Sequence, residues 1–182
     1  MDDGAPVPTD AQATADARQL LLSIGVIADQ LGTPQIRRAS DAVTVYFPMV
    51  VDGLMTDQTS SINYGHGGTV LSAIGVLTTP TPSTPYPTIS PAQAVSLLTS
   101  SGFSGYGGTN ISAGSSESDV VDVNVNEARL ELSTYVLADG TSWLLPTWSL
   151  SGPESGSQIT AGLTYQGSVL AISPQYIQLQ PR

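Results

Sequence analysis

Residues 9–32 read TDAQATADARQLLLSIGVIADQLG, and this stretch predicts the clearest helix of the chain. Thr9 and Gln12 have the spacing of a capping box, in which two side chains bond each other's backbone N–H groups. An apolar stripe with a period of about 3.6 residues follows, and it contains Ala13, Ala17, Leu20, Leu21, Ile24, Ala28 and Leu31. Gly32 and Pro34 are typical of a helix end. We expect an amphipathic helix that buries this stripe.

The next segment changes to a period of two, which predicts strands. The first strand begins with the alternating residues Val43, Val45 and Phe47. Pro48 has no backbone N–H, so it favours an edge position or a bulge. Asp52-Gly53 predicts a hairpin turn. Further strands are expected near residues 61–64 and 69–77, on either side of a glycine-rich turn.

The segment at 78–91, TTPTPSTPYPTISP, separates two parts of the chain by composition. Its prolines favour an extended polyproline conformation, so it is either a linker or a rigid strap across one domain. Ser90-Pro91-Ala92-Gln93 then has the cap, the N1 proline and the capping-box glutamine of a helix start. The predicted organisation is a leader at 1–9, a first half at 10–79, a linker at 80–90 and a second half at 91–182.

The second half predicts mostly strands after its helix. Residues 102–118 are rich in glycine and serine and predict a mobile loop. Hairpin turns are expected at Asp139-Gly140 and Gln166-Gly167. The expected strands lie at about 120–125, 128–137, 143–150, 159–165 and 169–172.

The two halves have a common order of motifs. Asp52-Gly53 corresponds to Asp139-Gly140. Residues 62–72, which contain Tyr64 and a glycine turn, correspond to residues 163–171, which contain Tyr165 and a glycine turn. This self-similarity predicts an α+β fold of two related halves, each a helix packed on an antiparallel sheet. Chance similarity between short hairpins is the alternative.

Several of these motifs also occur together in a known group of proteins. Tyr64-Gly65-His66-Gly67-Gly68, then Ser72-Ala73-Ile74-Gly75, then the Pro-Ala-Gln-Ala helix start resemble a pattern in uncharacterised actinobacterial membrane-anchored proteins. The same pattern includes DGTSWLLPTW at 139–148 and VLAI at 169–172. The Leu-Pro-x-Trp element at 145–148 is similar to PepSY-like and YycI-type extracytoplasmic regulators. The resemblance covers most of residues 40–176. It implies an anchored, outward-facing, non-enzymatic domain that modulates a membrane partner, and it carries over no catalytic residue.

Composition excludes several classes of function. The net charge is −10, and all five cations are arginines. Such an acidic chain repels phosphate backbones, so we expect no nucleic-acid binding. The absence of cysteine excludes disulfides, thiolate metal sites and cysteine nucleophiles.

The sequence contains no run of the roughly 20 apolar residues that a membrane span requires. Met1-Asp2-Asp3 is acidic, whereas a signal peptide begins with a basic segment. We expect that an export signal or anchor helix has been removed ahead of Met1. Membrane attachment would then depend on that missing segment alone, and the domain itself would be extracytoplasmic.

No catalytic or metal motif is complete. His66 lies in a Gly-His-Gly-Gly turn that resembles a hydrolase oxyanion loop. Such a loop requires a Gly-x-Ser-x-Gly elbow, and residues 102–106 have Tyr106 in place of the last glycine. A calcium loop starting at Asp122 fails because Glu127 replaces the required glycine and Ser133 the bidentate glutamate. We expect no cofactor, no metal and no enzymatic activity.

The remaining candidates are aromatic residues and the lone histidine. Trp148 shares a strand face with Leu144 and Leu150, whereas Trp143 points to the opposite face. This predicts one tryptophan in the core and one in a contact surface, although both can be core residues. The predicted contact surface consists of Tyr64, His66, Trp143, Trp148 and Tyr165.

The predicted function is that of a non-catalytic extracytoplasmic binding or regulatory module that contacts another envelope protein. One alternative is a cell-envelope hydrolase with an unrecognised site, which would need convergent acids or a serine beside His66. The other is a small-ligand carrier that uses a cleft between the halves. The oligomeric state is left open.

Overall fold

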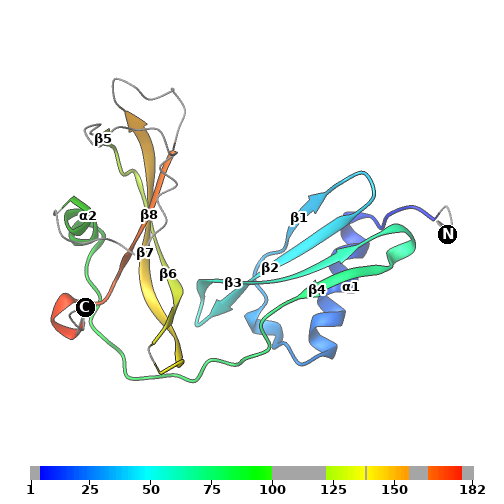
Figure 1. Ribbon diagram of the computed structural model, residues 1–182, viewed down its shortest axis with the longest axis horizontal. Helices are drawn as coiled ribbons and strands as arrows, with labels where there is room; N and C mark the ends of the chain where they lie inside the picture. Colours follow the sequence, from blue (N-terminus) through cyan, green and yellow to red (C-terminus); the bar gives the residue numbers. More distant parts are fainter. Residues whose placement is uncertain (1–4, 100–121, 138, 156–163, 178–182) are drawn as a thin grey trace. The chain divides into compact units, whose positions relative to one another are not determined.

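A computed structural model describes residues 5–99, 122–137, 139–155 and 164–177 of the chain (Figure 1). The α-helices of these ranges are α1 (Asp10–Ser23) and α2 (Pro91–Thr99). The strands are β1 (Gln35–Arg38), β2 (Val43–Val51), β3 (Leu54–Tyr64), β4 (Val70–Ile74), β5 (Asp122–Val123), β6 (Glu127–Val136), β7 (Ser142–Ser155) and β8 (Thr164–Leu170). The chain divides into two compact units. Unit 1 comprises Met1–Pro82 and Val136–Leu144, and unit 2 comprises Ser83–Tyr135 and Leu145–Arg182.

Unit 1 contains an antiparallel sheet with the strand order β1-β2-β3-β4, and α1 packs on one face of that sheet (Figure 1). The alternating pattern of β2 turns every second side chain toward the helix, as the sequence predicts. The buried cluster consists of Ala13, Ala17, Leu21, Val43, Val45, Phe47, Ile62 and Tyr64. Small alanines on α1 let the helix approach the sheet closely, and Leu21 fills the space beyond them.

Helix α1 begins as predicted but ends earlier. The capping box is confirmed, because Gln12 N–H donates to Thr9 Oγ1 over 3.3 Å and Thr9 N–H donates to Gln12 Oε1 over 3.1 Å. The predicted continuation to Leu31 is wrong. Gly25 adopts φ +102°, and Val26 N–H donates back to the Leu21 carbonyl over 3.0 Å. This is a Schellman C-cap, so the first glycine that can take positive φ ends the helix before Gly32 is reached.

The β2–β3 hairpin turns at Asp52-Gly53, as predicted. Both residues have positive φ, +49° and +80°, which is the conformation of a type I′ turn. Pro48 occupies a bulge rather than an edge, because β2 lies between β1 and β3 and the register shifts between Pro48 and Val50. The Pro48 carbonyl accepts from Gly32 N–H over 2.9 Å, which ties the chain after α1 to the sheet.

Unit 2 is built around α2, β7 and β8. The second capping box is confirmed, since Ser90 N–H donates to Gln93 Oε1 over 2.8 Å and Gln93 N–H donates to Ser90 Oγ over 3.3 Å. Strands β7 and β8 pair antiparallel from Thr147↔Leu170 to Pro153↔Thr164. The buried cluster of this unit consists of Ile89, Ala94, Leu150 and Val169.

The end of the proline-rich segment belongs to this second core. Ile89 N–H donates to the Ala171 carbonyl over 2.8 Å, and Ser173 N–H donates to the Pro87 carbonyl over 3.1 Å. Residues 81–88 are exposed, whereas Ile89 is buried. The first residues of the segment are therefore exposed, and its last residues pair with the backbone of residues 171–173 in unit 2.

The predicted fold of two related helix-on-sheet halves is wrong. Strands predominate, and they are not divided into two equivalent helix-backed sheets. The expected turn at Gln166-Gly167 is instead the middle of β8, where Gly167 pairs with Leu150. The Asp139-Gly140 turn does form, with Gly140 at φ +82°, but it belongs to unit 1. The repeat of motifs along the chain therefore does not correspond to a repeat in space. The loop predicted at 102–118 lies outside the described residues.

Replacing Leu21 with alanine should destabilise unit 1 by about 2–5 kcal/mol, because it leaves a cavity between α1 and β2. The natural control is Leu22→Ala, since Leu22 is 40% exposed and Leu21 is 1% exposed. Amide hydrogen exchange in β2 measures the effect within unit 1. Equal acceleration of exchange in the two variants would contradict this account of the core.

Candidate interaction surface

The distribution of the His, Asp and Glu side chains in the described ranges bears on whether they could hold a metal ion. No three His, Asp or Glu side chains in these ranges come together in a way that could hold a metal ion. The Asn124 N–H donates to the Pro153 carbonyl, and Asn126 N–H donates to the Ser151 carbonyl. The backbone that resembled a calcium loop is thus an extended segment beside β7.

His66 bonds to the N-terminal leader of the chain, at Ala5. Its side chain is exposed, and Nδ1 lies 3.0 Å from the Ala5 carbonyl, to which it donates. Gly67 N–H donates to the Pro6 carbonyl over 3.1 Å, and the positive φ of Gly67, +66°, permits that approach. The elbow proposed for a serine nucleophile, residues 102–106, lies outside the described residues. The contacts of His66 that the structure shows are structural.

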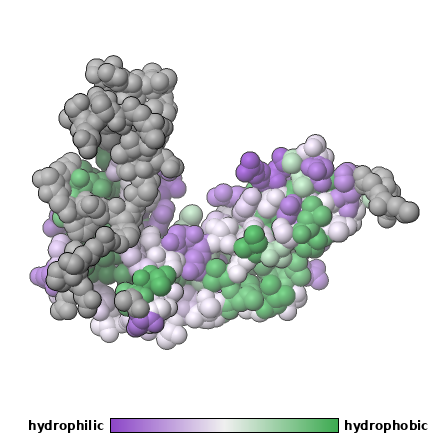
Figure 2. All heavy atoms as spheres, viewed as in Figure 1, coloured by the Kyte–Doolittle hydropathy of each residue, from purple (hydrophilic) through white to green (hydrophobic). Residues whose placement is uncertain are grey.

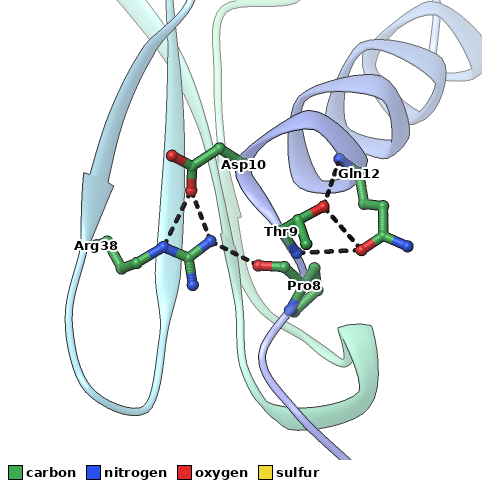
Figure 3. Close-up of polar contacts among 5 residues, drawn as sticks. All are labelled: Pro8, Thr9, Asp10, Gln12 and Arg38. Carbon is green, nitrogen blue, oxygen red and sulfur yellow. Dashed lines mark hydrogen bonds and ion pairs between the residues drawn. The ribbon is translucent and has the colours of Figure 1, made fainter.

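An arginine holds the same leader at the start of α1 (Figure 3). Arg38 donates through Nε to Asp10 Oδ1 over 3.0 Å and through Nη2 to the Pro8 carbonyl over 2.6 Å. Both side chains of this ion pair are about half exposed, so its contribution to stability is at most about 1 kcal/mol. One arginine of the Arg37-Arg38 pair is therefore committed to a local contact.

The five residues predicted to form a contact surface are not all surface residues. Tyr64 is 3% exposed and belongs to the core of unit 1. Its burial and, to a smaller extent, the charge of Asp16 raise the pKa of the Tyr64 phenol. Tyr165 is half-buried and covers Gly167, where an added Cβ would collide with the Tyr165 ring. Tyr64, His66 and Trp143 belong to unit 1, and Trp148 and Tyr165 to unit 2.

The two tryptophans differ in their hydrogen bonding. Trp148 packs against the buried cluster of unit 2, and its indole N–H donates to the Ile89 carbonyl over 2.9 Å. Trp143 is half-buried, and its indole nitrogen is buried without a hydrogen-bond partner among the described residues. Trp148 is thus a structural anchor for the proline-rich segment, which the sequence did not reveal.

Exposed edge strand β4 was not identified from the sequence as a site. All five of its residues are exposed, and three of them are the large apolar residues Val70, Leu71 and Ile74. In the described part of the chain β4 pairs only with β3, and it lies at the edge of the unit 1 sheet (Figure 1). The opposite edge strand, β1, carries Arg37 and Arg38 instead.

Hydrophobic residues gather on the side of unit 1 that carries β4 and α1 (Figure 2). The exposed apolar residues that belong to α1, to β4 and to the segments directly after them are Leu22, Ile24, Ile27, Val70, Leu71, Ile74 and Leu77. Val70, Leu71, Ile74 and Leu77 also lie in an uncharged stretch of the sequence, because residues 58–116 contain no Asp, Glu, Lys or Arg. That signal could have indicated the region before the structure was available.

Comparison with protein-family models, curated proteins and solved structures gave no match to this chain. None of the helices in the described ranges is long and apolar enough to cross a bilayer.

Replacing Trp148 with phenylalanine should destabilise unit 2 by about 1–3 kcal/mol, because the Ile89 carbonyl loses its indole donor inside the unit. Trp143→Phe is the matched control, since its indole N–H has no partner to lose within the described chain. Hydrogen exchange of the Ile89 and Val169 amides measures the first effect. The account fails if the two variants leave exchange equally unchanged.

Carboxylate titration gives a second test. Arg129 Nε donates to Glu127 Oε1 over 2.7 Å, and this hydrogen bond and the arginine's charge lower the pKa of Glu127. A lowered pKa favours the folded state above the ordinary carboxyl range, and the advantage is lost as the pH falls through the folded pKa. Arg129→Gln should raise the pKa of Glu127, measured by carboxyl NMR, whereas Arg37→Gln should leave it unchanged. An unaltered midpoint in Arg129→Gln would contradict this assignment.

Proposed function

We propose that this chain is a non-catalytic, extracytoplasmic binding module and that it contacts another envelope protein through β4. The observation that carries the proposal is the chemistry of this edge. An exposed strand with apolar side chains and an open backbone edge is a site where another chain can pair. Proteins that do not use such an edge usually protect it with charge, as β1 of this chain does.

The surroundings of β4 support the same proposal. Leu71 and Ile74 are 58% and 67% exposed, and Leu77 after the strand is 64% exposed. Large exposed apolar side chains that gather at one edge of a domain mark an interaction site, because their removal from water favours association. The absence of charged residues from 58 to 116 means that a partner meets little electrostatic opposition there, although the chain as a whole carries −10.

The titratable residues support the non-catalytic part of the proposal. His66 and Arg38 both hold the leader in place, and Glu127 is paired with Arg129. A hydrolase would instead need an acid and a base that converge on an open site. A binding role also agrees with the anchored, outward-facing regulators that the sequence resembles.

A photo-crosslinking residue at position 74 should capture an envelope protein in cells, because Ile74 stands on the exposed edge strand. The matched control is the same residue at position 36, since Ile36 lies on the charged edge strand β1 and is 40% exposed. Mass spectrometry of the products identifies the partner. Failure to crosslink at position 74, or identical products from both positions, would refute the proposed contact.

A further inference from the structure

We infer that β4 binds its partner by strand addition, and that the added strand is uncharged, with side chains that can pack on the exposed apolar residues of both β4 faces. This inference rests on the proposed function and specifies the partner segment at the same site. Its basis is the backbone edge of β4, the register of the sheet and the distribution of charge around the strand.

The backbone of β4 is suited to accept a strand. Gly65 N–H donates to the Thr69 carbonyl over 2.8 Å, so Thr69 directs its carbonyl toward β3. Backbone groups of an antiparallel strand alternate between its two edges, and the N–H and C=O of Val70 therefore point to the open edge. An incoming strand satisfies such groups with main-chain hydrogen bonds, which provide affinity without requiring a defined side-chain sequence.

The register of the sheet defines two different sides for the added strand. Tyr64 pairs with Val70 and Ile62 pairs with Ala73, and both β3 residues are buried beneath α1. On the opposite face, Asn63 pairs with Ser72 and Ser61 pairs with Ile74. Because neighbouring strands share their faces, a partner strand meets Val70 and Ala73 on the α1 side and Ser72 and the exposed Ile74 on the other side, so apolar contacts are available on both faces.

The strand residues next to β4 in the sheet are uncharged. The β3 residues paired with β4, Ser61 to Tyr64, are uncharged. So are the β2 residues paired with them in turn, Val43 to Tyr46. The first charges in this direction are Arg37 and Arg38 on β1. An acidic partner segment would lose hydration at β4 without gaining an opposite charge and would be repelled by the net charge of −10, so an uncharged segment is favoured over an acidic one.

A second copy of this chain also has an uncharged β4, but self-association is opposed by charge. Each copy carries a net charge of −10, and two such chains repel at long range. The occupant that the charge favours is therefore a segment of a different protein. Sedimentation of the wild-type chain and of Ile74→Lys tests this choice, because a dimer that the substitution abolishes would assign the edge to self-pairing and overturn the inference.

The decisive experiment uses a short synthetic peptide of alternating valine and threonine, labelled with a fluorophore, and the full chain. Two further peptides are N-methylated either at every valine or at every threonine. In an added strand only every second N–H faces β4, so one N-methylated peptide should bind about tenfold more weakly or worse, while the other binds like the parent. Replacing the threonines with glutamate should also weaken binding about tenfold, because a carboxylate gains no opposite charge at β4 and is repelled by the net charge of −10. Fluorescence anisotropy measures binding, and slower hydrogen exchange of the Val70 amide locates it.

Equal losses from the two methylation patterns, or no loss from either, would overturn strand addition. In either case the alternate N–H groups of the peptide would not differ in their contact with β4. Crosslinking at position 74 that persists in that case would leave the proposed partner contact in place and reject only its mode. Loss of crosslinking with peptide binding intact would instead reject the proposed envelope partner. The wild-type chain serves throughout the peptide series, so misfolding of a variant cannot imitate either result.

Discussion

The burial of the α1 stripe against β2 and β3 is the constraint on which unit 1 depends. Ala13, Ala17 and Leu21 cover the inward row of β2, and Ile62 and Tyr64 complete the cluster from β3. This packing fixes which face of the sheet is covered. Since β2 and β3 occupy the middle of the sheet, the helix stabilises the strands that hold β4 without needing to cover β4 itself. A fully exposed edge can therefore exist on a well-packed support.

The leader and the turn before β4 extend that support. Ala5 and Pro6 bond to the His66–Gly68 turn, and Arg38 holds the chain again at Pro8 and Asp10. The turn leads directly into β4, so contacts between distant parts of the sequence define where the edge strand begins. His66, which in isolation resembled a catalytic residue, has a positional role in this arrangement. In the described residues, unit 1 is accordingly a scaffold that holds an apolar edge strand, β4, and a charged edge strand, β1.

The features predicted correctly from the sequence depend on short-range chemistry. The capping boxes at Thr9 and Ser90 and the turn at Asp52-Gly53 involve residues only a few positions apart, so local patterns determine them. The end of α1 was missed because its apolar period continues past Gly25, whereas the φ of that glycine ends the helix. Gln166-Gly167 predicts a turn because Gln-Gly favours turns, yet the pairing with β7 and the Tyr165 ring keep Gly167 in a strand. Exposure of β4 depends on strand order, which no local pattern encodes.

The tether between the proline-rich segment and unit 2 determines how the protein can be dissected. Pro87 and Ile89 bond to the backbone of Ser173 and Ala171, and Trp148 reaches the same stretch. A fragment that starts at the α2 cap would expose one side of residues 171–173 and leave the indole without an acceptor. Any autonomous C-terminal piece must therefore retain Pro87 and Ile89, so the end of this stretch is a structural part of the piece and more than a spacer.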